Sequence, residues 1–521
     1  MSQGRRHFVC TLEDILDGAG VCSLVDGEQV ALFRVGEEVF ALENLDPFSG
    51  ANVIARGLVG DLAGQLVVAS PVYKQHFNLR SGRCLEDESV TLRTWPCGVL
   101  DGRVWVESAG QAAASARGKR RLVVVGNGMA AMRTVEELLL LAGDEYQITV
   151  FGAEPRGNYN RIMLSPLLAG ETSREQIMLH SLEWYREKGI TLHSGDPVVG
   201  IDRRNRRVIS AAGVVAGYDR LLLATGSDPV RLKVSGHDLP GVFYFRSIDD
   251  VDGMLEQAAQ AKRAVVIGGG LLGLEAASGL AKHGLKVTVV HIRDRVMDKQ
   301  LDEEAADLLR QAMEARGISF CMPARTAAFE GEGRVQQLRT EDGRVLAADL
   351  VVVAAGITPR TELARSCGLT CDRGILVDDT LQTYDPAVYA VGECVQHRGA
   401  TYGLVAPLWE QARVCAAHLA ERGVTRYRGS KPASQLKVSG IDVFSAGDIA
   451  DLRGAESIRY ADRAAGIYKR LWLKDNRVLA AVLYGDTSAA ARLADLIETQ
   501  RDVSAQREAL LLGDLAGGSA A

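Results

Sequence analysis

Two glycine-rich stretches of the chain have the spacing that binds the pyrophosphate of a dinucleotide. Each follows an apolar run that we expect to form a strand, and each precedes a segment with helical periodicity. The first glycine of such a loop permits a tight turn, the second lets a phosphate approach the backbone, and a small third residue lets helix pack on strand. The loop residues are Gly126, Gly128, Met129 and Ala131 in the first stretch and Gly268, Gly270, Leu272 and Gly273 in the second. Two loops in one chain predict two dinucleotides, a flavin and a nicotinamide cofactor.

Three shorter stretches also follow predicted strands: Ala224-Thr225-Gly226, Gly356 in "AAGITPR" and Gly392-Glu393 in "YAVGEC". This order of signals resembles the FAD-dependent pyridine-nucleotide oxidoreductase family, whose nicotinamide domain is inserted within the FAD domain. The resemblance implies that Ala224-Thr225-Gly226 closes the FAD domain at the insertion. It also implies that Gly392-Glu393 bonds the flavin ribityl chain, with Glu in place of the family's Asp.

Longer stretches of sequence indicate a particular group within this family. "EPRGNYNRIMLSPLLAGE", "GGGLLGLEAASGL" and "YAVGECVQHRGATYGLVAPLWEQA" are similar to the N-terminal half of the large subunit of bacterial NAD(P)H nitrite reductases, over roughly residues 120–490. Residues 5–107, with "DPFSGANVIARGLVGD" and "VASPVYKQHFNLRSGRCLEDE", resemble the small subunit of that family, a Rieske-type fold. The chain therefore looks like the small subunit fused ahead of the flavin half of the large one.

The Rieske-like stretch lacks the ligands of a cluster. By the Rieske pattern, Asp46 and Phe48 replace the first Cys-x-His pair, and Ser70 and Tyr73 replace the second. A [2Fe–2S] centre requires thiolates and imidazoles, which these side chains do not supply. We predict a β scaffold that is retained for docking and holds no cluster; the alternative is an unusual metal site that uses His76 and Cys84.

The nine cysteines have no Cys-x-x-Cys spacing. Cys367 and Cys371 are close in sequence, but a sirohaem–[4Fe–4S] site would also need a Cys-x5-Cys pair, which the sequence lacks. No histidine pair has zinc-ligand spacing, and no Cys-x4-Cys redox pair follows the first glycine loop. We therefore expect no metal and no dithiol chemistry, so that reduced flavin passes its electrons to another protein.

Other single residues are candidates for cofactor binding through the family resemblance. In the family an acid at the end of the second strand binds the FAD ribose, and Ala153 occupies that position here, with Glu154 one residue later. Either Glu154 bends back to bind the ribose hydroxyls, or other groups bind them. Arg161 resembles the arginine that these reductases place near the FAD phosphates, and a surface salt bridge is the alternative. Trp409 is a candidate contact of the isoalloxazine ring, or an ordinary core tryptophan.

The nicotinamide dinucleotide has candidate contacts of its own. His291 stands where NAD-selective enzymes usually have a carboxylate that repels the 2′-phosphate. With Arg293 and Arg295 nearby, the sequence predicts that NADPH is tolerated beside NADH. Glu275, two residues after Gly273, lies towards the nicotinamide in related reductases; as a helix residue it is equally compatible with an ordinary solvated acid.

The elements that must position these residues change along the chain. Short β-rich runs with Gly and Asp turns over 1–107 predict an all-β domain. Strand–helix alternation after residue 120 predicts two doubly wound α/β (Rossmann-type) domains, followed by a small α+β domain. We expect the linker at 108–119, the FAD domain at 120–238 and 357–428, the NAD(P) domain at 239–356, the C-terminal domain at 429–510 and a tail at 511–521.

Composition and charge exclude several classes of protein. The chain is 47% apolar and 24% charged, with a net charge of −6 and no basic cluster, which argues against a nucleic-acid partner. No apolar run approaches membrane-spanning length and no signal peptide is apparent, so we expect a cytoplasmic protein. The sequence predicts an FAD-dependent NAD(P)H oxidoreductase serving a nitrite or nitrate reductase, with an oligomer possible. The alternatives are a general rubredoxin or ferredoxin reductase and a flavin-based redox-sensing interaction protein.

Overall fold

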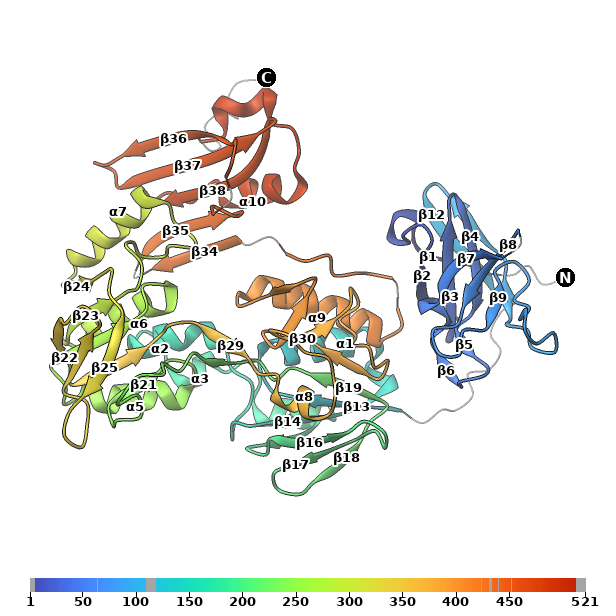
Figure 1. The fold of residues 1–521 in the computed structure, drawn as a ribbon, viewed down its shortest axis with the longest axis horizontal. Helices are drawn as coiled ribbons and strands as arrows, with labels where there is room; N and C mark the ends of the chain where they lie inside the picture. Colours follow the sequence, from blue (N-terminus) through green and yellow to red (C-terminus); the bar gives the residue numbers. More distant parts are fainter. Residues whose placement is uncertain are drawn as a thin grey trace. The chain divides into compact units, whose positions relative to one another are not determined.

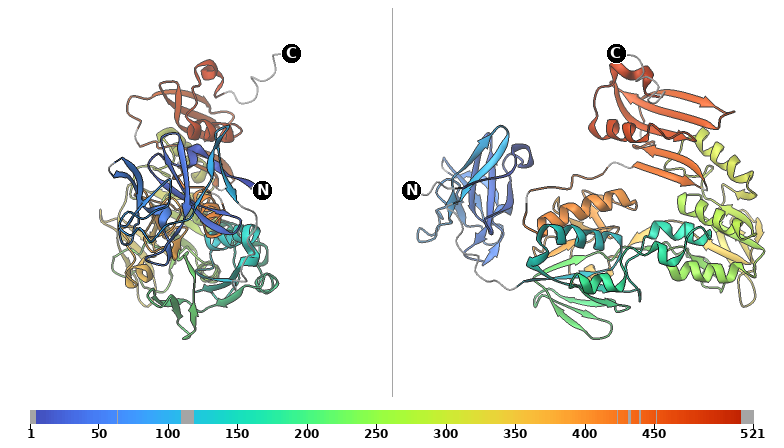
Figure 2. Two further views of the ribbon diagram at one scale, coloured as in Figure 1. Left: turned by 90° about the vertical axis from the view of Figure 1, so that its right-hand side faces the viewer. Right: turned by 180° about the vertical axis from the view of Figure 1, so that it is seen from behind.

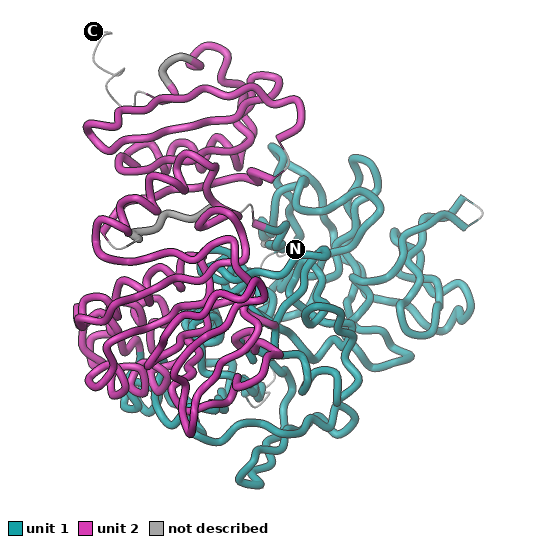
Figure 3. Tube along the Cα trace, turned by 60° about the vertical axis from the view of Figure 1, so that its left-hand side comes forward, with its two compact units in different colours: residues 1–158, 180–226, 359–429 teal, residues 159–179, 227–358, 430–521 magenta. Residues whose placement is uncertain are grey.

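The computed structural model describes residues 5–62, 64–108, 119–422, 424–430, 433–438, 440–450 and 452–511. The chain divides into two compact units (Figure 3). Unit 1 comprises residues 1–158, 180–226 and 359–429, and unit 2 comprises residues 159–179, 227–358 and 430–521. Each unit therefore recruits segments that are far apart in the sequence.

The N-terminal part of unit 1 is an all-β domain, drawn in blue in Figure 1. Its larger sheets have the strand orders β1-β12-β11, β10-β4-β3-β2 and β7-β8-β9. Burial alternates along β2 and β12, so each strand turns one face to the core, as its sequence pattern predicts. The strands are β1 (Arg5–Thr11), β2 (Gly20–Val25), β3 (Glu28–Val35), β4 (Glu38–Glu43), β5 (Leu45–Asp46), β6 (Ala51–Asn52), β7 (Leu58–Leu62), β8 (Gln65–Ala69), β9 (His76–Asn78), β10 (Thr94–Trp95), β11 (Cys97–Leu100) and β12 (Arg103–Ser108).

The rest of unit 1 is built on a parallel sheet with the order β15-β14-β13-β19-β31. Its strands are β13 (Arg120–Val125), β14 (Tyr146–Gly152), β15 (Thr191–Ser194), β19 (Arg220–Leu223) and β31 (Val388–Ala390). Helices α1 (Met129–Ala142) and α9 (Val405–Leu419) lie side by side against it (Figure 1) and share its apolar core. The remaining elements are α4 (Leu182–Glu187), β16 (Val198–Asp202), β17 (Arg207–Ser210), β18 (Val215–Gly217), α8 (Glu362–Ser366), β30 (Ile375–Val377), β32 (Val395–His397) and β33 (Ala400–Thr401).

Unit 2 contains a second parallel sheet, with the order β21-β28-β22-β23-β24. Its strands are β21 (Val242–Tyr244), β22 (Arg263–Ile267), β23 (Lys286–Val290), β24 (Ile318–Cys321) and β28 (Leu350–Val353). The helices of this part are α2 (Leu164–Leu168), α3 (Arg174–Ile177), α5 (Ile248–Ala258), α6 (Leu271–Lys282) and α7 (Glu303–Glu314). Short strands complete it: β20 (Ser227–Pro229), β25 (Thr326–Glu330), β26 (Gln337–Thr340), β27 (Val345–Ala347) and β29 (Ile357–Pro359).

The C-terminal part of unit 2 is an antiparallel sheet with the order β34-β35-β38-β37-β36, drawn in orange to red in Figure 2. Helix α10 (Ala490–Thr499) packs on it through a buried cluster that includes Leu493 and Ile497. The strands are β34 (Ala433–Val438), β35 (Ile441–Ala446), β36 (Glu456–Asp462), β37 (Ile467–Lys474) and β38 (Arg477–Tyr484).

The fold class predicted from the sequence is confirmed: an all-β Rieske-like domain, two Rossmann-type sheets and a small α+β domain. The exact domain boundaries stay a prediction. The expected linker, 108–119, and the expected tail, 511–521, lie almost entirely outside the described residues. Among the described residues, no helix is long and apolar enough to cross a membrane.

Candidate functional site

The first glycine loop joins β13 to α1 in unit 1. Gly126 has φ +112°, and a Cβ there would lie 2.2 Å from the carbonyl oxygen of Ala224, so no other residue fits without backbone movement. Gly128 immediately precedes α1, and a Cβ on it would meet no atom within 4 Å. Ala131 is fully buried in the helix. The loop is therefore tight against the neighbouring strand and open at the helix N-terminus.

The second loop, between β22 and α6 in unit 2, repeats this geometry. Gly268 has φ +123°, and a Cβ there would lie 2.2 Å from the carbonyl oxygen of Ala354. Gly270 precedes α6 and has open space where its Cβ would be. A Cβ on Gly273 would lie 1.9 Å from the carbonyl oxygen of Gly268, so the third position admits only glycine. Met129 and Leu272 lie in the first turns of their helices.

Both loops thus fit the phosphates of a dinucleotide. At each loop a helix N-terminus supplies backbone donors, and the absence of a side chain at Gly128 or Gly270 leaves those donors accessible. Unit 1 is the candidate FAD-binding part and unit 2 the candidate nicotinamide-binding part.

A buried glutamine that the sequence reasoning missed adjoins the Gly392-Glu393 turn. Gln411, on α9, is fully buried, and its Oε1 accepts the amide N–H of Gly392 at 2.9 Å. Its Nε2 is buried and has no partner among the described residues. Gly392 itself has φ +91°, and a Cβ there would lie 3.0 Å from that of Ala130. A polar donor without a partner beside the predicted ribityl-binding turn fits a bound flavin. The only sequence signal is one Gln on an otherwise apolar helix face.

A second buried network supports the first glycine loop. The Tyr185 hydroxyl donates to Oδ1 of Asn127 at 2.6 Å, and Asn158 Nδ2 donates to the Asn127 carbonyl oxygen at 2.9 Å. His180 lies 3.3 Å from Asn158 and 2.8 Å from Glu136 on α1. Burial raises the pKa of Tyr185 to about 12, so the hydroxyl keeps its proton. The network ties α1 and α4 to the loop, and sequence spacing did not predict it.

The other predicted FAD contacts lie at the ends of the same sheet. Ala224 donates its amide to the carbonyl of Val125, and the Thr225 hydroxyl donates to the carbonyl oxygen of Arg360 at 2.9 Å. β14 ends at Gly152, after which Ala153 is exposed and Glu154 half-buried. The ribose role of Glu154 stays a prediction.

Trp409 and Arg161 have defined neighbours. Trp409, on α9, is half-buried, and the Arg133 guanidinium of α1 lies 5.9 Å from its ring centre. Arg161 belongs to unit 2, where its Nη1 donates to the carbonyl of Arg246 at 2.8 Å and its guanidinium lies over the ring of Tyr159. The proposed contacts of Trp409 with the isoalloxazine and of Arg161 with the FAD phosphates stay predictions.

His291 follows β23 and supports the second glycine loop. Its Nδ1 accepts the amide N–H of Gly269 at 3.0 Å, so its Nε2 carries the proton and faces Oδ1 of Asp298 at 3.2 Å. Nε of Arg293 lies 3.9 Å from Oδ2 of Asp298, and the Arg293 side chain is 69% exposed. Both ring nitrogens of His291 are engaged within the chain. The exposed Arg293, whose ion pair with Asp298 is long, stays a candidate contact of a ribose 2′-phosphate. Gly356, also predicted to bind a cofactor, has φ +116°, and its carbonyl oxygen accepts the amide N–H of Val230.

Glu275 is a half-buried acid on α6. The Ser165 hydroxyl, on α2, donates to Oε2 of Glu275 at 2.5 Å. Burial raises the pKa of Glu275 above its usual value, although the Ser165 hydrogen bond opposes the shift. This environment is not that of an ordinary solvated acid, and the contact of Glu275 with the nicotinamide stays a prediction.

A buried hydrogen bond joins the two loops of the Rieske-like domain that correspond to the cluster-binding loops of the pattern. The Ser70 hydroxyl donates to Oδ2 of Asp46 at 2.5 Å, and both residues are fully buried. Phe48 and Tyr73, at the predicted histidine positions, are 36% and 60% exposed. These side chains do not fit a [2Fe–2S] cluster.

The alternative metal site has a different arrangement. His76 Nδ1 lies 2.5 Å from Oε1 of Glu86, and the Cys84 thiol points to Oε2 of the same carboxylate at 3.5 Å. Among the residues that the structure describes, no group of three or more His, Cys, Asp or Glu side chains is arranged to hold a metal ion. All nine cysteines are free thiols, and burial raises the pKa of both Cys367 and Cys371.

The geometry of the two loops agrees with the comparison to known families. Residues 120–418 match the family model "Pyridine nucleotide-disulphide oxidoreductase". The chain belongs to this family. Its members bind FAD and NAD(P)H, which confirms the predicted cofactors. Residues 7–107 match a Rieske-like 2Fe–2S domain, and residues 432–501 match the C-terminal domain of rubredoxin NAD⁺ reductases.

Several relatives carry names from nitrogen assimilation. The chain is 48% identical to the NAD(P)H nitrite reductase of Bacillus subtilis, over 74% of this chain and 48% of the relative. It is 43% identical to the assimilatory nitrate reductase electron transfer subunit of the same organism, over 77% of this chain and 52% of the relative. The chain spans about half the length of these curated relatives. The predicted resemblance is thereby confirmed.

Among solved structures, the covalent putidaredoxin reductase–putidaredoxin complex is similar with a TM-score of 0.70 and 27% identity. The match covers 77% of this chain and 97% of that one. A ferredoxin reductase from Rhodopseudomonas palustris gives the same TM-score at 26% identity.

Proposed function

We propose that this protein is an FAD-dependent NAD(P)H oxidoreductase that delivers electrons to a separate acceptor protein, the catalytic component of an assimilatory nitrite or nitrate reductase. The observation that carries the proposal is the pair of glycine loops with matched geometry, one in each unit. The names of the relatives support the choice of acceptor. We place the reaction in the cytoplasm, where NAD(P)H is supplied.

Bound FAD would supply the chemistry that matches a two-electron donor, NAD(P)H, to one-electron metal centres. The residues of the chain supply binding and positioning. Gly128 and Gly270 leave helix N-termini open to the two pyrophosphates, and Gln411 holds the turn at Gly392. Positioning of two bound reactants contributes much of the rate in such a transfer.

The electrons must then leave the chain. The nine thiols form no disulfide, burial raises the pKa of Cys367 and of Cys371, and the Rieske-like loops carry no cluster ligands. Oxidation of one NAD(P)H releases two electrons and one proton, and an external acceptor takes both electrons. The Rieske-like domain is proposed to contribute to docking of that acceptor.

The test is a set of assays on the purified full chain. We expect a yellow protein that contains FAD and no stoichiometric iron. It should oxidise NAD(P)H with ferricyanide or a dye and form no ammonia from nitrite. About two irons per chain with a Rieske-type EPR signal, or ammonia formed by the chain alone, would contradict the proposal. Deletion of residues 1–110 should leave dye reduction nearly intact and impair delivery to the reductase partner; unimpaired delivery would remove the docking role.

A second candidate function is a general rubredoxin or ferredoxin reductase. It is favoured by the match of residues 432–501 to the C-terminal domain of rubredoxin NAD⁺ reductases and by the similarity to a reductase–putidaredoxin complex. Comparison of kcat/KM for rubredoxin, ferredoxin and the nitrite reductase catalytic component distinguishes the two. Turnover of any acceptor at a useful rate would exclude a pure redox-sensing role.

A further inference from the structure

The segment that follows α9 lies against the Rieske-like domain within unit 1. We call residues 421, 422 and 424–427 the strap. Val424 is 8% exposed and belongs to the apolar cluster of the β domain that contains Ile15 and Val21. Nη2 of Arg426 donates to the carbonyl oxygen of Gly20, at the start of β2, at 3.1 Å. The strap therefore completes part of the core of a domain that precedes it by more than three hundred residues in the chain.

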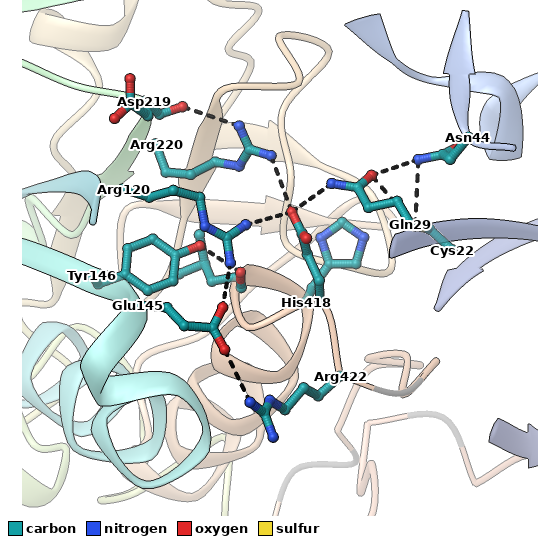
Figure 4. A network of polar contacts seen from close by, with 12 residues as sticks. Cys22, Gln29, Asn44, Arg120, Glu145, Tyr146, Asp219, Arg220, His418 and Arg422 are labelled. Carbon is teal, nitrogen blue, oxygen red and sulfur yellow. Dashed lines mark hydrogen bonds and ion pairs between the residues drawn. The ribbon is translucent and has the colours of Figure 1, made fainter. Parts of the chain in front are cut away.

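Glu421, the first residue of the strap, connects the two domains through its contacts with Gln29 and Arg120, which are labelled in Figure 4. Its side chain is 13% exposed. Its Oε1 accepts from Gln29 Nε2, on β3 of the Rieske-like domain, at 2.6 Å. The same oxygen accepts from Arg120 Nη1, on β13, at 2.6 Å and lies 3.5 Å from Arg220 Nη2, on β19. One carboxylate thus joins the Rieske-like domain to two strands of the parallel sheet, and charged donors make these bonds stronger than neutral ones.

The network continues into the Rieske-like domain. Asn44 is 2% exposed, and its Nδ2 donates to Oε1 of Gln29 at 2.8 Å. Its Oδ1 accepts the amide of Ala55 at 2.8 Å. The polar contacts that begin at Glu421 therefore extend through Gln29 and Asn44 to the backbone of Ala55.

The position of this network on the parallel sheet separates it from the dinucleotide loop. Arg120 and Arg220 are the first residues of β13 and β19, and Tyr146, the first residue of β14, packs under the Arg120 guanidinium. Parallel strands begin at one edge of a sheet and end at the other. The glycine loop follows the last residue of β13, about 20 Å away at roughly 3.3 Å per residue.

We infer that the Rieske-like domain binds the amino-terminal edge of the FAD-domain sheet through the strap and Glu421, independently of the covalent linker, and leaves the dinucleotide loop uncovered. The occupant of this surface is the chain's own Rieske-like domain, identified by Val424 in its core and by Gln29 and Gly20 as partners of the strap. The fusion then keeps the two partners at high effective concentration, but does not create their contact.

The test uses the full chain with a protease recognition sequence inserted between residues 108 and 119. After cleavage, sedimentation over a concentration series measures the dissociation constant of the two fragments. We expect the fragments to sediment together, and Glu421→Gln or Arg426→Ala to raise their dissociation constant about tenfold or more, because each removes a charged partner from a largely buried contact. Arg428→Ala is the matched control, since Arg428 is exposed two residues beyond Arg426.

Hydrogen exchange on the uncut chain gives a second measurement. Glu421→Gln and Arg426→Ala should increase exchange in residues 20–31, and Arg428→Ala should not. Glu421 also binds Arg120 on β13, so Glu421→Gln could alter the parallel sheet as well as the interface. Arg426→Ala does not remove that contact and is then the decisive variant. Fragments that separate at every concentration, or interface variants that behave like Arg428→Ala, would overturn the inference. Because both readouts report association and not turnover, they are independent of the identity of the electron acceptor.

Discussion

The Ser70 hydroxyl donates a 2.5 Å hydrogen bond to Asp46, and both side chains are fully buried in the Rieske-like domain. Oδ1 of Asp46 accepts from the amides of Phe48 and Ser49, and the Ser70 oxygen accepts from the amide of Val72. The pair therefore closes two loops on each other at the positions where the Rieske pattern has its cysteine ligands. A buried hydrogen bond therefore joins the two loops at the positions where the pattern has cluster ligands.

Ser70→Ala should destabilise this domain. The substitution leaves an oxygen of the buried Asp46 carboxylate without a donor, which costs about 1–3 kcal/mol. Hydrogen exchange of the segments around residues 46 and 70 in the full chain measures the effect. Tyr73→Phe is the control: the Tyr73 side chain is 60% exposed, and its change should stay within about 0.5 kcal/mol. Equal exchange in the two variants would show that the pair is structurally neutral.

Local patterns account for what the sequence could predict. The glycine loops are short and contiguous, and sterics constrain them. A Cβ on Gly126 or on Gly268 would lie 2.2 Å from a neighbouring carbonyl oxygen. Because these positions require glycine, the residue types and their spacing can be recognised in the sequence. The alternation of β2 and the strand–helix order of the Rossmann sheets are local in the same sense.

The parts that the sequence could not predict depend on single polar residues brought together over long distances. Glu421 and Gln29 are 392 positions apart, and neither belongs to a motif. Gln411 was missed because a lone Gln on a helix has no spacing signal. The sequence pattern indicates His291 as a candidate residue but does not indicate its partners, because its hydrogen bond with the amide of Gly269 depends on the loop conformation.

Glu275→Gln should raise stability and lower activity. Burial raises the pKa of Glu275 in the folded state above its value in the unfolded chain. The group therefore contributes to folding stability at low pH, where it is protonated, and this contribution is lost as the pH rises through the folded-state pKa. The neutral amide keeps an acceptor for Ser165 and removes that loss, so unfolding at neutral pH should need more urea. If Glu275 contacts the nicotinamide, flavin reduction by NAD(P)H should slow about tenfold, or about 1.4 kcal/mol in the barrier. Stopped-flow absorbance measures this rate, with the exposed Glu332→Gln as control. A more stable variant with an unchanged rate would assign Glu275 a structural role only.

NADPH should be used with a kcat/KM within about tenfold of NADH, a difference of less than about 1.4 kcal/mol. His291 presents no carboxylate to repel a 2′-phosphate, and the exposed Arg293, 3.9 Å from Asp298, is the cation that we expect to attract one. Arg293→Gln should lower kcat/KM for NADPH several-fold and leave that for NADH nearly unchanged, whereas His291→Glu should disfavour NADPH and also weaken the loop at Gly269. A wild-type protein strongly selective for NADH, and insensitive to both changes, would show that another residue discriminates the coenzymes.

His418 should make unit 1 sensitive to acid. Burial lowers its pKa to about 4, with Arg56 next in effect; Arg220 and Arg426 lower it further and Asp378 opposes them. Gln382 Nε2 donates to the Tyr389 hydroxyl, which in turn donates to Nδ1 of His418 at 2.9 Å, so the neutral ring is the form that fits.

The sign of this effect follows from the two pKa values. A histidine in the unfolded chain titrates near 6.5, so between pH 6.5 and pH 4 the unfolded state binds the proton and the folded state does not. This contribution of His418 to stability is therefore fully present above pH 6.5 and falls as the pH drops towards 4, by roughly 3 kcal/mol.

The urea midpoint of flavin release, measured from pH 4 to pH 8, should show this slope in the wild type. His418→Gln keeps an acceptor for Tyr389 without a titrating ring and should flatten the slope, whereas His237→Gln, at an exposed histidine of unit 2, should leave it unchanged. An equal slope in the wild type and in His418→Gln would mean that other groups set the acid sensitivity of this unit.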